Sequence, residues 1–223
     1  MPRLSDKTRE QRRQHILTSA WRCFSRDGFH ATSIEDVIAA TGMSSSAVYR
    51  YFRSKEEIIR ASAEIGVERV GDIFVALLDR DPCPTPAETL ALLVDELHTR
   101  TDNPEYDMTR VAVQTWAEAL RDPQLHGHAR ARYRDALDHL VELATRWRDA
   151  GHIPADADTK AVAATIFSLM HGLIVMHHLV EDVPADVLLR GVSSLGAATD
   201  SSRIQPSRHT GDSTVVNKPI WTV

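Results

Sequence analysis

Apolar residues recur every three or four positions along most of the chain, which is the spacing of one face of an α-helix. Prolines, glycines and helix-capping residues separate these stripes, and no stretch alternates as a half-buried strand does. The pattern predicts helices over residues 8–27, 32–41, 44–52, 54–79, 85–102, 108–121, 122–150, 159–181 and 185–198. The expected fold class is therefore all-α.

Short helices with sharp boundaries are expected between residues 32 and 58. Thr32 and Glu35 have the spacing of a capping box, which begins the first of them, and Gly42 ends it. Ser44 can cap the second. Two short helices joined by a glycine-containing turn of about three to four residues are typical of a helix-turn-helix.

The second short helix, residues 44–52, carries small, hydroxyl-bearing, aromatic and basic side chains on its outward face. Hydroxyl groups, Tyr and Arg donate hydrogen bonds to phosphates and base edges, and the Ala47 methyl can contact thymine. This composition favours DNA binding. A fragment of a helical bundle with a solvated face is the alternative, because matches to helix-turn-helix spacing are common.

Three runs of residues in this region resemble the TetR-type bacterial regulators. They are residues 38–44 (IAATGMS), 48–52 (VYRYF) and 54–58 (SKEEI). The family pattern fixes several spacings across more than one element, so the resemblance is more specific than a lone short motif. The departures at Thr41 and Met43, where the family usually has Ala and Val, remove no positioning contact.

The resemblance implies a three-helix DNA-binding domain over residues 8–55 and a helical effector-binding and dimerisation domain over 56–198. It implies a homodimeric transcriptional repressor that leaves a palindromic operator when a small hydrophobic ligand binds. Each protomer would lay the helix 44–52 in the major groove, at half-sites about 34 Å apart or a multiple of that distance.

The expected DNA contacts fall into two groups. The base-edge group is Ser45, Ala47 and Arg50, and Ser44 and Ser46 lie beside it. The phosphate-positioning group is Thr32, Ser33, Tyr49, Tyr51 and Lys55.

A basic turn, formed by Arg9, Arg12 and Arg13, begins the first helix. Basic charge there is unfavourable to the helix dipole, so this turn is either a phosphate contact or a solvated arginine face.

The last two helices have surplus apolar surface. Residues 159–181 are apolar nearly all round, which is typical of a helix buried on two sides, and residues 185–198 carry a second stripe. Two-fold packing of both would form a four-helix bundle, and the resemblance implies the same homodimer. The alternative is a central helix buried in a monomer.

A ligand cavity in the body is implied mainly by the resemblance. Candidate lining residues combine aromatic, methionine and polar character on inward faces, and each could equally be plain core. They are Met108, Trp116, Tyr133, Phe167, Met170, His171, Ile174 and His177.

Charge is divided unevenly along the 223 residues. Residues 1–60 hold 11 Lys and Arg against 7 Asp and Glu, a net charge of +4, and residues 61–223 hold the remaining −9 of the total −5. A basic N-terminal third on an acidic body can orient a protein on DNA.

Several functional classes have no support. No apolar run approaches the roughly 18–20 residues of a membrane span and no secretory signal begins the chain, so a cytoplasmic location without membrane contact is expected. The two cysteines are expected to be buried free thiols. No two histidines have the spacing of ligands on one helix face, so no metal and no cofactor are predicted.

Two rival functions remain. One is an architectural or interaction protein without an effector, whose body serves only to dimerise. The other is an enzyme with a vestigial helix-turn-helix, although no phosphate-binding loop or nucleophile elbow occurs. Residues 199–223 are polar, lack periodicity and are expected to be disordered.

Overall fold

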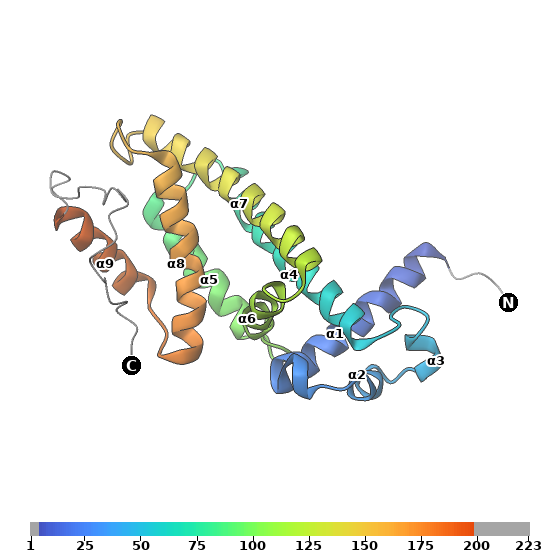
Figure 1. Cartoon of the computed structure of the whole chain (residues 1–223). Coiled ribbons are helices and arrows are strands. Elements are labelled where there is room, and N and C mark those ends of the chain that lie inside the picture. The colour runs from blue at the N-terminus through green and yellow to red at the C-terminus, as the bar shows by residue number, and fades with distance from the viewer. Residues whose placement is uncertain (1–4, 199–223) are drawn as a thin grey trace, which may run out of the picture. The chain divides into compact units, whose positions relative to one another are not determined.

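A computed structural model describes residues 5–198 of the chain (Figure 1). These residues form nine α-helices and no strand, so the predicted all-α fold is confirmed. The helices are α1 (Asp6–Ala31), α2 (Ile34–Thr41), α3 (Ser45–Val48), α4 (Lys55–Leu78), α5 (Pro86–Thr101), α6 (Met108–Ala119), α7 (Pro123–Asp149), α8 (Thr159–Leu179) and α9 (Ala185–Ala198). The predicted disordered tail, residues 199–223, lies outside the described residues.

The chain divides into two compact units, residues 1–189 and residues 190–223. The first unit holds α1 to α8 and the start of α9, and contains every site discussed below. The described part of the second unit is the end of α9, where the Ser194 hydroxyl donates to the Arg190 carbonyl at 2.8 Å. The predicted division at residue 55 stays a prediction.

The first helix begins and ends through local interactions. Ser5 caps its start by accepting from the Thr8 amide. Gly28, where the helix was expected to end, has φ 88° and ψ 164°, and the helical turn after it closes at Ala31. Only glycine adopts that backbone conformation readily, so the interruption follows directly from the sequence.

The capping box before α2 lies one residue later than predicted. The Ser33 hydroxyl accepts from the Asp36 amide at 3.0 Å, and the Asp36 carboxylate accepts from the Ser33 amide at 2.8 Å. The prediction that Thr32 caps this helix was wrong, because the Thr32 hydroxyl donates to the Gly28 carbonyl and closes the preceding helix.

Helix α3 is shorter than the predicted helix 44–52. Regular helix covers Ser45–Val48 only. A tight turn follows, in which the Val48 carbonyl accepts from the amides of Tyr51 and Phe52 at 2.8 and 3.1 Å. The turn brings Phe52 into the core, where 4% of its surface is exposed.

Two main hydrophobic cores stabilise the first unit. The N-terminal core packs Ile16, Trp21 and Phe24 of α1 against α2, α3 and the start of α4. It also includes Met108 and Val111 of α6, so the core continues beyond the predicted domain boundary.

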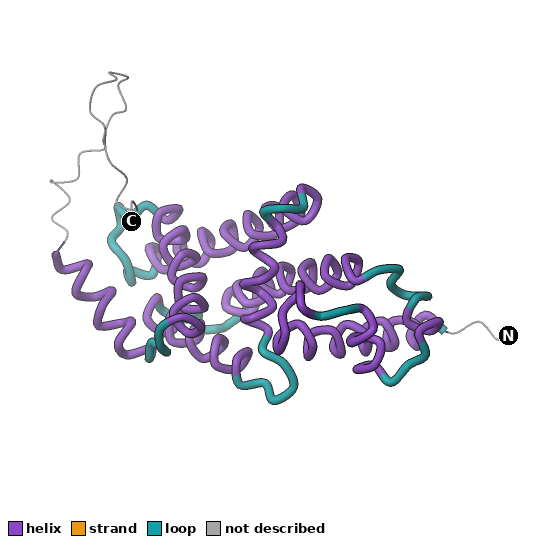
Figure 2. The backbone as a smooth tube through the Cα atoms, turned by 60° about the horizontal axis from the view of Figure 1, so that its bottom comes forward, coloured by secondary structure: helices purple, strands orange, loops and turns teal. Residues whose placement is uncertain are grey.

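The second core lies between α4, α5, α7 and α8, and α4 runs beside α7 (Figure 1). Figure 2 shows the described residues as helices joined by loops. Cys23 is buried as predicted, whereas Cys83 is only half-buried, and both are free thiols.

Helix α8 differs from expectation. Its mean hydropathy of 1.5 would suit a membrane span by length and composition, so the prediction that no stretch approaches one was wrong. Within the described residues no other helix meets that test. Core helices of soluble proteins also meet it, yet only 17% of the apolar window in α8 is buried here. The alternative of a helix buried within one chain therefore does not hold.

Candidate nucleic-acid interface and effector cavity

The turn between α2 and α3 is held from both sides. Gly42 ends α2 in the left-handed conformation at φ 65°, and the Met43 amide donates to the Thr41 hydroxyl at 3.0 Å. The Thr41 carbonyl lies 2.8 Å from Nε2 of His15 on α1. Together with the buried Val48, these contacts fix how α3 is presented.

Most of the predicted DNA contacts on α3 and the turn after it face solvent. Ala47 and Tyr51 are half-buried, and Nε of Arg50 is a long 3.4 Å from the Ser46 carbonyl. The remaining guanidinium donors of Arg50 stay available. The exposed residues are Ser44, Ser45, Ser46, Tyr49 and Arg50.

Thr32 and Lys55 are placed differently from the predicted phosphate contacts. Thr32 is 1% exposed and its hydroxyl is already bonded, so its side chain does not reach the surface. The Lys55 ammonium donates to the carbonyls of Phe29 and Thr32 at 3.1 and 3.0 Å. Lys55 therefore supplies donors to backbone carbonyls at the end of α1 and positions the start of α4. Ser33 is half-buried within its capping box.

Arginines on α1 extend the basic surface of α3. Arg9 and Arg12 are exposed and share one shallow depression with Ala47, Arg50 and Tyr51. The Arg13 guanidinium carbon lies 5.5 Å from the centroid of the Phe52 ring, and its Nη1 lies 3.8 Å from Oε1 of Glu10. The spacing of the basic turn raised Arg9 and Arg12 as candidates. The fold brings them beside residues 44–52, which comprise α3 and the turn after it and are called the recognition segment below.

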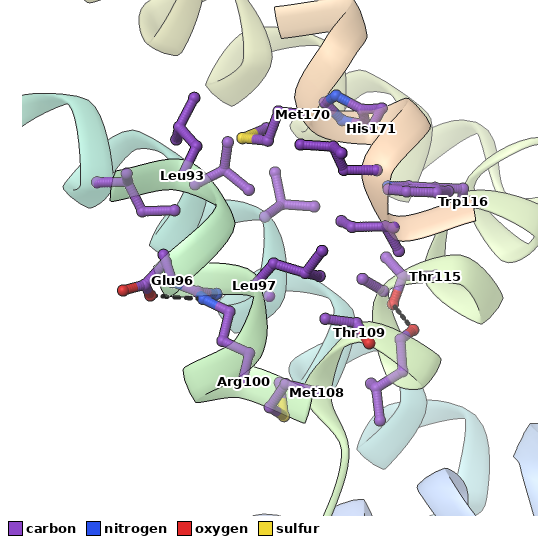
Figure 3. Close-up of a pocket in the computed structure, with 18 of the residues that line it drawn as sticks. Leu93, Glu96, Leu97, Arg100, Met108, Thr109, Thr115, Trp116, Met170 and His171 are labelled. Carbon is purple, nitrogen blue, oxygen red and sulfur yellow. Dashed lines mark hydrogen bonds and ion pairs between the residues drawn. The ribbon is translucent and has the colours of Figure 1, made fainter. Parts of the chain in front are cut away.

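A cavity lies between α4, α5, α6, α7 and α8 (Figure 3). Its volume is about 70 Å³, and its wall is mainly apolar. The Glu96–Arg100 ion pair of 2.7 Å lies at the α5 side, and Trp116 and His171 lie on the opposite wall (Figure 3). The Thr115 hydroxyl donates its hydrogen to the Val111 carbonyl at 2.9 Å.

Most, but not all, of the predicted lining residues border this cavity. Phe167 lies behind His171, with ring centroids 4.4 Å apart, and His177 belongs to a separate cluster near the end of α8. The predicted residues at the wall are Met108, Trp116, Tyr133, Met170, His171 and Ile174. Sequence reasoning missed the contribution of α4 and α5, whose apolar stripes are indistinguishable from core: Val67, Val70, Ile73, Leu93 and Leu97.

The polar atoms of the aromatic wall make few, specific hydrogen bonds. Trp116 Nε1 donates to the Tyr133 hydroxyl at 2.8 Å, and burial raises the pKa of Tyr133. Nδ1 of His171 lies 2.8 Å from the Phe167 carbonyl and must carry the hydrogen, since a carbonyl only accepts. Burial lowers the pKa of His171, so the ring is neutral at pH 7 and its Nε2 is an acceptor.

Helix α6 connects the cavity wall to α1. The Gln114 side chain accepts from the Phe29 amide at 2.5 Å and donates to the Phe24 carbonyl at 3.1 Å. Just before α6, Glu105 pairs with Arg22 of α1 at 2.7 Å. Trp116, which lines the cavity, is only two residues from Gln114.

The fold and the exposed basic surface define a helix-turn-helix DNA-binding protein. A family model described as bacterial regulatory proteins of the tetR family matches residues 16–62, and one described as BetI-type transcriptional repressor, C-terminal, matches residues 86–195. The chain belongs to the TetR family of bacterial transcriptional regulators. The match of residues 86–195 to a repressor model supports a role as a transcriptional repressor.

Curated relatives are transcriptional regulators. The chain is 26% identical over 181 residues to the regulator UidR of Escherichia coli K12, covering 81% of this chain and 86% of that protein. It is 28% identical over 175 residues to AcrR of Shigella flexneri, covering 78% and 81%.

Solved structures share the fold. A transcriptional regulator from Saccharomonospora viridis in complex with choline matches with a TM-score of 0.68 at 22% identity, covering 85% of this chain and 97% of that one. The regulator FadR from Bacillus subtilis in complex with stearoyl-CoA matches with a TM-score of 0.60 at 17% identity, covering 82% and 96%.

Proposed function

We propose that the chain is a cytoplasmic homodimeric repressor that binds a palindromic operator and is released by a small, largely apolar effector. The observation that carries the proposal is the double role of α6, whose Trp116 lines the cavity and whose Gln114 holds Phe24 and Phe29 of the DNA-binding part. An effector that binds better when α6 has shifted draws the dimer away from the arrangement that fits DNA.

DNA recognition follows from the exposed surface. Ser45, Ala47 and Arg50 would reach base edges from α3 and the turn after it. Arg9 and Arg12, beside them in the same depression, would bind phosphates, together with Tyr49. Lys55 would act indirectly, by fixing the end of α1 against the start of α4.

The effector would have to widen the cavity. A volume of about 70 Å³ is small beside the roughly 300–1,000 Å³ of ordinary ligand pockets. Because the walls come from α4 and α6, which also contact the DNA-binding part, widening would be transmitted to α1. Proteins of similar fold are known in complex with choline and with stearoyl-CoA, which supports a small-molecule effector for this chain. The apolar and aromatic wall favours a ligand that is apolar or aromatic.

Dimerisation would use the uncovered face of α8, with the start of α9, up to Leu189, beside it. The exposed positions follow one helical stripe, rich in small residues that let two helices approach closely: Ala161, Ala164, Ser168, Gly172, Val175 and Leu179. An apolar groove between α8 and the start of α9 adjoins this stripe. A second copy of the chain would cover it by two-fold packing.

Two matched glycines test the dimer. Gly172 on α8 and Gly127 on α7 are both exposed, and an added Cβ meets nothing within 4 Å at either position. Sedimentation equilibrium should give a dimer of the 24.9 kDa chain for wild type and Gly127→Glu, and a monomer for Gly172→Glu. A monomeric wild type, or a dimeric Gly172→Glu, would contradict the proposed interface.

A further inference from the structure

A cluster of histidine and aspartate side chains lies where the end of α8 meets the start of α6. One ligand-type atom from each of Asp107, His177 and His178 lies within 4.8 Å of the other two. All three residues are half-buried. The sequence did not indicate this cluster, because Asp107 is distant along the chain and the adjacent histidines lack the spacing of ligands on one helix face.

Two of the three residues, Asp107 and His177, already have the hydrogen bonding of a ligand. Oδ1 of Asp107 caps α6 by accepting from the amides of Thr109 and Arg110, at 2.8 and 3.2 Å, which leaves Oδ2 for a cation. Nδ1 of His177 is hydrogen-bonded to the Asp182 carboxylate, so its Nε2 carries the lone pair. A carboxylate behind the imidazole is the usual second partner of a metal-bound histidine.

His178 completes the set. Its Nε2 lies 3.9 Å from Oδ2 of Asp107 and donates to the Thr109 hydroxyl at 2.7 Å, because that hydroxyl gives its own hydrogen to Oδ1 of Asp107 at 2.6 Å. A bound ion would take the place of the hydrogen on Nε2, and the ring would then carry its hydrogen on Nδ1.

We propose that His177, His178 and Asp107 form a site for a divalent transition-metal ion of the zinc type, with Asp182 as the outer partner of His177. Two imidazole nitrogens, one carboxylate oxygen and a water suit such an ion. Ligand atoms around tetrahedral zinc lie about 3.4 Å apart, so small side-chain rotations would close the present spacing. The site does not depend on the proposed effector or operator.

One nearby charge opposes a cation. Nε of Arg110 lies 3.6 Å from Oδ2 of Asp107. The Arg110 side chain is 58% exposed, so it can turn into solvent when an ion binds. The carboxylates of Asp107 and Asp182 then outnumber the positive charges that remain within hydrogen-bonding reach.

The test uses the untagged full chain, stripped with chelator and titrated with Zn²⁺ by calorimetry and with Co²⁺ by visible absorption. We expect one ion per chain and the absorption of tetrahedral Co²⁺. His177→Gln should abolish both signals, and Asp182→Asn should weaken Zn²⁺ binding by about 10–100-fold. Asp107→Asn, which keeps a good helix cap, should also lose the site without unfolding.

The matched control is His126→Gln, at an exposed histidine on α7. Circular dichroism of every variant checks that the helices are intact. Binding that is equal in wild type, His177→Gln and His126→Gln would place the metal on unrelated surface histidines and overturn the proposal. No binding by the wild type would overturn it as well.

Discussion

The exposed side chains of the recognition segment are free to contact a partner, whereas their neighbours are committed to the core. Val48 and Phe52 are buried beneath the segment, so substitutions there change stability. Arg50 is exposed and makes one long hydrogen bond to its own segment, so removing it should leave the fold intact. This contrast allows DNA recognition to be tested separately from folding.

Arg50→Ala should weaken operator binding by about 1–3 kcal/mol if the guanidinium reads a guanine, because a bidentate contact to one base pair is lost. Binding to random DNA should fall much less. Fluorescence anisotropy on both DNAs measures the difference. The control is Arg80→Ala, at an exposed arginine just beyond the C-terminal end of α4. An equal loss on random DNA would make Arg50 a phosphate contact.

Gly28→Ala should lower the free energy of unfolding by about 1–3 kcal/mol, because φ 88° with ψ 164° is strained for any residue with a Cβ. The added Cβ would also lie 3.3 Å from Oε1 of Gln114. Gly71→Ala, in open space on α4, should instead stabilise the protein by about 0.5–1 kcal/mol. Urea unfolding measures the free energy of unfolding of both variants. Equal changes in the two would contradict backbone strain at position 28.

The neutral, buried His171 should make stability depend on pH. Its pKa is lowered in the folded chain, so below its usual value near 6.5 the unfolded chain takes up a proton that the folded chain does not. The free energy of unfolding should therefore fall from pH 7 to pH 5, and fall less steeply in His171→Gln. Gln124→Ala, at an exposed residue on α7 that does not titrate, should keep the wild-type slope. An unchanged slope in His171→Gln would contradict the assignment.

Residues near α2 show why some roles could not be predicted from the sequence. Thr32 with Glu35 and Ser33 with Asp36 are overlapping capping patterns, and local spacing does not choose between them. The choice depends on the Gly28 carbonyl, which takes the Thr32 hydroxyl. The hydrogen bonds of Lys55 to three carbonyls could not be predicted, because those carbonyls belong to the end of α1, which is distant in sequence. Its role as a phosphate contact stays a prediction.

Elements whose ends depend on local chemistry were predicted well. The Thr85 and Glu88 capping box and the Asp122 cap before Pro123 begin α5 and α7 as expected. The length of α3 was overestimated, because the position of Phe52 in the core decides where that helix stops. The α4 and α5 walls of the cavity were missed, since an apolar stripe is the same whether it faces a core or a cavity.

Helix α6 is the element on which coupling depends, and Gln114 is its contact with α1. Gln114→Ala would leave the amide of Phe29, a residue 3% exposed, without its acceptor. We expect a loss of about 1–3 kcal/mol in the free energy of unfolding. Gln124→Ala, at an exposed glutamine on α7, should change stability by less than about 0.5 kcal/mol. Equal stability of the two variants in urea would show that Gln114 does not stabilise the contact between α6 and α1.

At the scale of the whole molecule, the basic N-terminal third and the acidic body have different tasks. The net charge of +4 over residues 1–60 includes the arginines that lie beside α3. The acidic body discourages contact with DNA elsewhere on the chain. Dimerisation through α8 would then set two recognition segments at the spacing of two half-sites.

Selection of sheared genomic DNA by the purified protein, sequenced across a salt series, tests specific operator binding most directly. We predict a single palindromic motif whose half-sites are about 34 Å apart or a multiple of that distance, enriched at every salt concentration that permits binding. Enrichment without a motif, falling steeply with salt, would mean that the protein binds DNA through phosphates alone. In that case the chain would be an architectural protein, and the account of an effector-controlled repressor would be wrong.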